Sequence, residues 1–126
     1  MPKLSKDTAP DIEDAGPAMD RGGPLDEYTV DFVTIREGHS LAPMLKGLPG
    51  DSCQCPHWGY MLAGKVTVSY PDHEEVYQAG DAFYMPPGHV PAAETGSEFI
   101  QFSPTQQLAD TIAVIKANAQ RMMAGG

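Results

Sequence analysis

Three side chains that bind transition metals well occupy alternate positions in the middle of the chain: Cys53, Cys55 and His57. In a β-strand, residues two apart point to the same face, so an extended segment here would place two thiols and an imidazole on one wall. A fourth such side chain, His89, follows Gly88 in a segment rich in proline and glycine. Thiolate and imidazole together favour zinc, with iron, nickel or copper as alternatives, whereas the sparse carboxylates nearby disfavour calcium or magnesium.

The two cysteines suit a shared metal better than a disulfide bond. Along one strand their α-carbons would lie roughly 6.5 Å apart, near the upper limit for a disulfide. We therefore predict a divalent metal bound by Cys53, Cys55, His57 and His89. Pro56 could turn one thiol away, so three protein ligands with a water and four protein ligands both stay open. A pocket without metal is a further alternative, because free cysteines are often simply buried.

Three more side chains are candidates to line the same pocket. Met61 has the same strand parity as His57, and we expect it beyond the ligands on that wall. Tyr84 and Glu94 are the candidate proton carriers for a pocket reaction. His39 and His73 are expected in turns, away from the metal.

Short β-rich segments separated by glycine and proline must position these residues. The predicted strands cover residues 28–36, 41–48, 53–62, 65–70, 75–78, 82–85, 90–94 and 98–103. Turn signals recurring roughly every 8 to 12 residues are typical of a β-sandwich or barrel. Residues 28–103 are therefore expected to form one all-β domain.

The two ends of the chain differ from this pattern. Residues 1–27 are acidic, contain four prolines and few apolar side chains, and predict a flexible arm, or one that orders only against a partner subunit. At the other end, Ser103, Pro104 and Gln106 form a capping-box pattern. We predict that residues 104–123 form an amphipathic helix that packs on the outside of the sheet. Its apolar stripe is Leu108, Ile112, Ile115, Ala119 and Met122.

Two segments, GDSCQCPHWGYMLAG (50–64) and GDAFYMPPGHVP (80–91), resemble the two signature motifs of the cupin superfamily. Gly64, Gly80, Pro86 and Gly88 match its framework positions. The four positions where cupins have their metal ligands instead have Asp51, Cys53, His57 and Pro91. The resemblance implies a jelly-roll β-barrel with a small-molecule pocket and paired sheets in a homodimer. The metal ligands, by contrast, rest on strand parity and ligand chemistry.

Composition limits the function further. The chain has 126 residues, enough for one domain, and its 17 acidic against 8 basic side chains give a net charge of −9. Such a charge disfavours nucleic acid as a partner. Without an apolar run of about 20 residues, no membrane span is expected. Residues 1–20 also lack the apolar centre of a secretory signal, so we expect a cytoplasmic protein.

The outer face of the strand over 53–62 has Trp58, Tyr60 and Leu62, an apolar row that needs cover. The C-terminal helix or a second subunit could supply it, and we expect a homodimer.

Together these features favour a metal-binding single-domain cupin whose Cys/His-lined pocket takes a small molecule, with its reaction unassigned. If it is an enzyme, its metal would polarise a substrate oxygen or activate water or dioxygen. The alternative is a non-catalytic, zinc-stabilised or ligand-sensing module. A third hypothesis, an interaction domain without a ligand, rests mainly on the acidic N-terminal segment.

Overall fold

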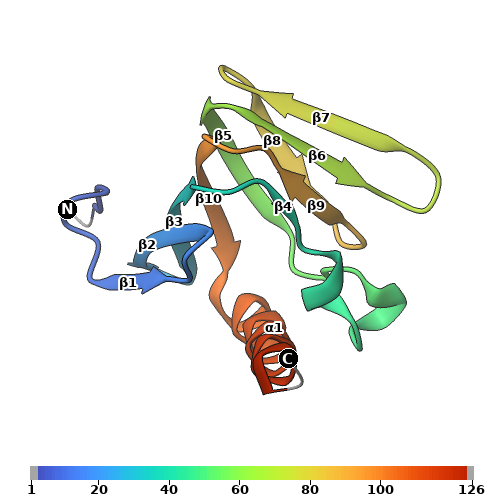
Figure 1. The fold of residues 1–126 in the computed structure, drawn as a ribbon. Helices are drawn as coiled ribbons and strands as arrows, with labels where there is room; N and C mark the ends of the chain where they lie inside the picture. Colours follow the sequence, from blue (N-terminus) through green and yellow to red (C-terminus); the bar gives the residue numbers. More distant parts are fainter. Residues whose placement is uncertain (1–2, 125–126) are drawn as a thin grey trace.

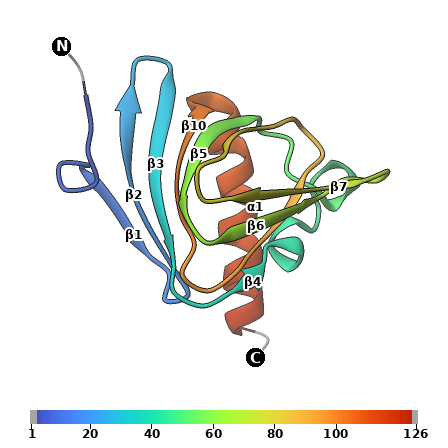
Figure 2. The same ribbon diagram turned by 90° about the horizontal axis from the view of Figure 1, so that it is seen from above.

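The computed structural model describes residues 3–124, which form two antiparallel sheets and a C-terminal helix (Figures 1 and 2). The first sheet has the strand order β1 (Asp11–Asp14), β2 (Ala18–Leu25), β3 (Tyr28–Ile35), β10 (Glu98–Pro104), β5 (His57–Ala63) and β8 (Ala82–Met85). The second has the order β4 (His39–Ser40), β9 (Val90–Ala93), β6 (Lys65–Ser69) and β7 (Glu74–Gln78). The remaining elements are two short 3₁₀ helices, η1 (Ala42–Leu45) and η2 (Pro49–Asp51), and the helix α1 (Thr105–Ala124). The predicted jelly-roll β fold with a C-terminal helix is confirmed.

The main core lies between the two sheets, where alternate residues of each strand point inward. Its buried members are Met61, Val66, Val68, Tyr77, Phe83 and Met85. The rings of Tyr77 and Phe83 stack with their centroids 4.8 Å apart. Within the described part of the chain, no helix has the length and hydropathy of a membrane span.

Two of the motif glycines hold turns that other residues would strain. Gly64, between β5 and β6, has a φ of 78°, and Gly88, directly before His89, has a φ of 98°. Both values lie in the left-handed region that favours glycine. The sequence motifs therefore coincide with backbone corners that set the direction of β6 and of His89.

The N-terminal segment departs from the predicted flexible arm. Residues 18–25 form β2 and pair along their whole length with β3, and β1 pairs with β2 in turn. A Cβ on Gly23 would meet the side chains of Leu4 and Pro10, which pack against this strand. The segment has few apolar side chains. It is ordered instead by the backbone hydrogen bonds that join β2 to the otherwise exposed edge of β3.

Two predicted strands also differ in the structure. Residues 42–45, expected within a strand, form η1, with Pro43 in its first turn. The strand expected from Cys53 begins only at His57, and the sole pairing of Cys53 is an isolated bridge to His89. Pro56 interrupts the segment because proline has no backbone N–H to donate to a sheet.

The helix covers a different part of the sheets from the one predicted. It packs against η1, β10 and β3 at one open end of the sandwich rather than on the outer face (Figure 1). Asn118 holds it there, since its buried Nδ2 donates to the carbonyls of Met44 (2.6 Å) and Lys46 (2.8 Å). Of the predicted stripe, Leu108, Ile112, Ile115 and Ala119 are half-buried. The side chain of Met122 lies outside the described residues.

Candidate metal centre

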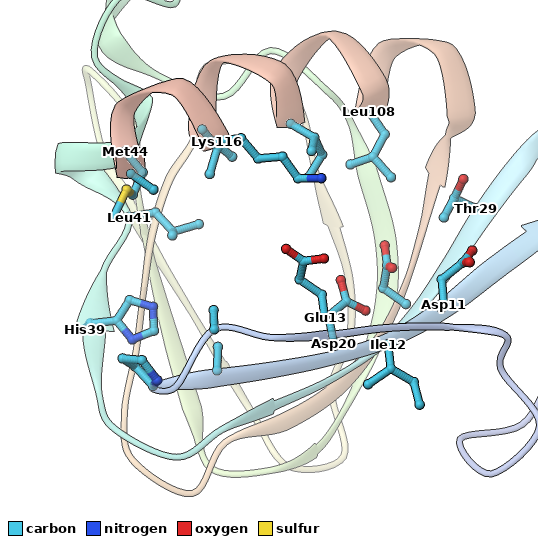
Figure 3. A pocket seen from close by; sticks show the side chains of 18 of the residues that line it. Asp11, Ile12, Glu13, Asp20, Thr29, His39, Leu41, Met44, Leu108 and Lys116 are labelled. Carbon is cyan, nitrogen blue, oxygen red and sulfur yellow. The ribbon is translucent and has the colours of Figure 1, made fainter. Parts of the chain in front are cut away.

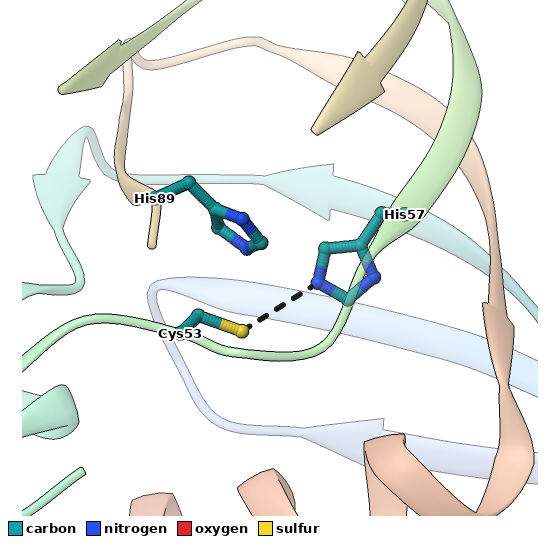
Figure 4. A group of neighbouring side chains, drawn as sticks. All are labelled: Cys53, His57 and His89. Atoms are coloured by element: carbon teal, nitrogen blue, oxygen red, sulfur yellow. Dashed lines mark hydrogen bonds between the residues drawn. The ribbon is translucent and has the colours of Figure 1, made fainter. Parts of the chain in front are cut away.

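Three of the four predicted metal ligands meet in the interior of the fold. The nitrogen or sulfur ligand atoms of Cys53, His57 and His89 all lie within 4.8 Å of one another (Figure 4). Cys53 Sγ is 3.8 Å from His57 Nε2, and the two imidazole centroids are 5.1 Å apart. The exposed fractions of the three residues are 5%, 6% and 0%, in the same order. These distances allow one small ion between them.

Different elements deliver the three side chains. His57 is the first residue of β5, and His89 lies between Gly88 and the start of β9. Cys53 reaches them because two backbone hydrogen bonds join its segment to the 88–89 turn: Cys53 N to His89 O (2.9 Å) and Gly88 N to Cys53 O (2.8 Å). The proline-glycine turn and the irregular 53–56 segment thus form the site together.

Each imidazole is oriented through its Nδ1 atom. His57 Nδ1 is 2.6 Å from the hydroxyl of buried Ser103, and His89 Nδ1 donates to the carbonyl of Pro86 at 2.6 Å. This leaves both Nε2 atoms facing the cluster, and His89 Nε2 is buried without a hydrogen-bond partner. Histidines that bind metals usually engage their second nitrogen in this way. A buried nitrogen without a partner is costly unless a ligand satisfies it.

The protonation of the site suits a cation. Burial, and then the nearby His89, lowers the pKa of His57 to about 3. Burial also lowers the pKa of His89, so both rings are neutral near pH 7 and each offers a lone pair. Burial raises the pKa of the Cys53 thiol. A bound metal would reverse that shift, because a coordinating thiol is deprotonated.

Cys55, the fourth predicted ligand, does not join this cluster. Its thiol contacts the carbonyl of Pro56 at 3.5 Å, and the residue is buried with Leu45 beneath α1. Burial, then the neighbouring Cys53, raises its pKa to about 12. The two thiols do not share a face as predicted, because the chain is not extended between residues 53 and 57.

Of the three predicted pocket-lining residues, Met61 shares the inner face of β5 with His57 as expected, whereas Tyr84 and Glu94 lie on the surface. Met61 is buried in the core between the sheets. Tyr84 is exposed on the outer face of β8 and stacks on Trp58, with centroids 5.1 Å apart. Glu94 is exposed and forms an ion pair with Lys65 at 3.5 Å. Tyr84 and Glu94 are therefore not placed to carry protons at the cluster.

Sequence reasoning missed Ser103, whose hydroxyl we expected at the start of the helix. The strand β10 instead continues through Pro104, and the helix begins at Thr105. Ser103 faces inward because Gln101 pairs with Gly59, which places Ser103 beside His57. A strand alignment between residues 57–63 and 98–104 would have revealed it.

Several solved structures share this fold. A protein of unknown function from Rhizobium leguminosarum is 20% identical, with a TM-score of 0.60 over 82% of this chain and 95% of that chain. An RmlC-like cupin from Shewanella frigidimarina is 22% identical, with a TM-score of 0.53 over 75% of this chain and 83% of that chain. The polyketide cyclase RemF from Streptomyces resistomycificus is 16% identical, with a TM-score of 0.57 over 82% and 79% of the two chains.

No protein-family model matches the sequence, and the search of curated proteins gives no match. The structural likenesses show that the chain has the cupin fold. Within that fold, the described residues bring together a buried cluster of one cysteine and two histidines.

Proposed function

We propose that this chain is a metal-binding cupin in which Cys53, His57 and His89 bind one zinc ion. The observation that carries the proposal is the buried Nε2 of His89, which lacks a partner and lies beside His57 Nε2 and Cys53 Sγ. Neutral imidazoles and a thiolate are ligands that zinc binds well, and iron, nickel and copper accept the same set.

Three protein ligands leave a fourth position for a water or a small molecule. In such a site bound zinc polarises a ligand oxygen and lowers the pKa of bound water. Ser103 and the Pro86 carbonyl hold the two imidazoles in place. One fold neighbour is named a polyketide cyclase, which supports a small organic molecule as the partner of this fold. The reaction, if there is one, stays unassigned because the expected proton carriers lie elsewhere.

A non-catalytic role is the second candidate, and the burial of the site favours it. The three ligand residues are almost completely inaccessible. A closed zinc site stabilises its fold, since metal binding is coupled to folding. Under this alternative, zinc would stabilise the contact between the 53–56 segment and the turn before β9. The zinc-loaded protein would then show no exchangeable water bound to the metal.

Metal analysis of the purified chain tests the proposal. We expect one zinc per chain after chelation and repletion, and a large loss of zinc in His57→Ala. His73→Ala is the matched control, because His73 lies exposed on the β6–β7 hairpin, bonded to Asp72 and Glu75. Equal zinc content in wild type and His57→Ala would remove His57 from the site.

We also propose a homodimer built on the outer face of the six-stranded sheet. Among residues 3–121, six large apolar side chains on this face are 39–51% exposed, and α1 does not cover them: Tyr28, Trp58, Tyr60, Leu62, Tyr84 and Phe102. The group contains no charged residue, and aromatic side chains are enriched in the centres of interfaces. A second copy of the same face matches it, as in isologous dimers.

Sedimentation distinguishes the outcomes for the dimer. We expect a dimer for the wild type and a shift toward monomer in Trp58→Ser. Val76→Ser, which removes an exposed apolar side chain from β7, should leave the dimer unchanged. A wild type that sediments as a stable monomer would contradict the proposal.

A further inference from the structure

A cavity of about 570 Å³ lies between α1 and the inner face of β1, β2 and β3 (Figure 3). This volume is within the range of small-molecule sites, about 300–1,000 Å³. None of Cys53, His57 and His89 lines it. The cavity is thus separate from the metal centre, and a ligand could occupy it whether or not a metal is bound.

One side of the cavity is formed by carboxyl groups from three neighbouring strands. Asp11 and Glu13 of β1, Asp20 of β2 and Asp31 of β3 all line it. The register explains the grouping: Asp11 and Asp31 both pair with Gly22, and Glu13 pairs with Asp20. Figure 3 shows Asp11, Glu13 and Asp20 on the strands opposite the helix.

The Asp31 carboxyl is buried against the adjoining strand β2. The residue is only 8% exposed, and a Cβ on Gly22 would lie 2.5 Å from Asp31 Oδ1. Glycine at this position of β2 therefore makes the space that the carboxyl occupies. Neighbouring Asp20 has its Oδ1 buried without a hydrogen-bond partner.

Lys116 of α1 lines the same cavity but forms no ion pair with these two carboxyls. Within residues 3–121, neither Asp20 nor Asp31 forms an ion pair. Burial, and then the charge of Asp31, raises the pKa of Asp20 to about 8, so Asp20 keeps a proton near pH 7. Burial also raises the pKa of Asp31. A buried carboxylate without a cation or strong donors is costly, and a bound cation would relieve that cost.

The opposite side of the cavity is apolar. It is formed by the half-buried stripe of α1, with Leu41 and Met44 beside it. Lys116 extends from the helix over the cavity, and His39 lies at its edge (Figure 3). A site with carboxyls on one side and aliphatic side chains on the other fits a molecule with one charged and one apolar part.

We propose that this cavity binds an organic ammonium ion, with its charged nitrogen at Asp20 and Asp31 and its apolar body against α1. A bare calcium or magnesium ion fits poorly, because it needs about six oxygen ligands and would leave the apolar wall uncovered. An anion is disfavoured by the four carboxyl groups.

Tryptamine is a suitable probe, with tryptophol, its neutral alcohol analogue, as the matched ligand. By calorimetry on the full chain, we expect one tryptamine site and at least tenfold weaker binding of tryptophol. Asp31→Asn should weaken tryptamine binding at least tenfold, the loss expected of a charged hydrogen bond, and leave tryptophol unchanged. Glu74→Gln is the control, because it removes one negative charge from an exposed position on β7. It should change the binding affinity of neither ligand.

Gly22→Ala gives a second variant, since its methyl group would lie 2.5 Å from Asp31 Oδ1 and 2.7 Å from the Val30 carbonyl oxygen, so that both the carboxyl and the adjoining backbone must shift. Like Asp31→Asn, this variant should weaken the binding of tryptamine and leave the binding of tryptophol unchanged. If either variant fails to fold, amide shifts in the wild type decide: tryptamine should perturb β2, β3 and α1. Equal binding of amine and alcohol, shifts elsewhere, or displacement of tryptamine by equimolar calcium would overturn the proposal.

Discussion

Replacing Ser103 with alanine should weaken zinc binding although all three ligands stay in place. Ser103 is fully buried, and its oxygen lies 2.6 Å from His57 Nδ1. When His57 Nε2 faces the metal, Nδ1 carries the hydrogen and donates to Ser103. Alanine leaves that N–H buried without an acceptor and frees the ring to rotate.

The expected loss of affinity is that of a single orienting hydrogen bond. Ser103→Ala removes one of the two hydrogen bonds that orient the imidazoles, while the bond from His89 to Pro86 remains. Loss of such an outer partner typically costs about 10- to 100-fold in metal affinity. This corresponds to about 1.4–2.7 kcal/mol of binding free energy. Competition against a chromophoric zinc chelator measures the change directly.

Ser97→Ala is the matched control for this experiment. Ser97 is equally buried, but its hydroxyl bonds to the backbone of Lys65 and to the Glu94 carbonyl, outside the metal centre. It should lower stability and leave zinc affinity unchanged. The reasoning is refuted if Ser103→Ala binds zinc as tightly as the wild type, or if both serine variants lose affinity equally.

Two further changes test the fold around the cavity. Asn118→Ala removes both hydrogen bonds that hold α1 to the carbonyls of Met44 and Lys46. It should lower the free energy of unfolding by about 1–3 kcal/mol in urea titrations. Gln120→Ala is the control, because the structure shows no side-chain hydrogen bond for Gln120 within residues 3–121. This variant should change the free energy of unfolding by less than about 0.5 kcal/mol. Asp20→Asn tests the raised pKa, about 8 against an ordinary value of 3.8. Because the folded state of the wild type holds this proton more tightly than the unfolded state, its stability falls as pH rises from about 4 to about 8. The asparagine variant should therefore gain stability relative to wild type as the pH rises through this window, and the gain should level off above about pH 8. A difference that does not change with pH would contradict the pKa assignment.

Local sequence signals predicted most of the strands. Residues 65–70, 75–78 and 82–85 alternate in polarity or are bounded by proline and glycine turns, and β6, β7 and β8 form at these positions. Gly64 and Gly88 could be recognised because their backbone conformations exclude most other residues.

The errors arose where contacts distant in sequence decide the structure. The N-terminal strands depend on the free edge of β3, which no property of residues 1–27 reveals. Similarly, the position of Cys53 depends on its backbone bonds to the 88–89 turn, so strand parity wrongly predicted that the Cys55 thiol would lie with Cys53, His57 and His89. Tyr84 was misplaced because it lies on the outer face of β8.

X-ray absorption at the zinc edge tests the central claim most directly. For the zinc-loaded chain we predict one sulfur at about 2.3 Å and two imidazole nitrogens at about 2.0–2.1 Å, with one light atom completing the shell. The sulfur signal should persist in Cys55→Ser and disappear in Cys53→Ser. A first shell with two sulfurs, or with none, would contradict a centre formed by Cys53, His57 and His89.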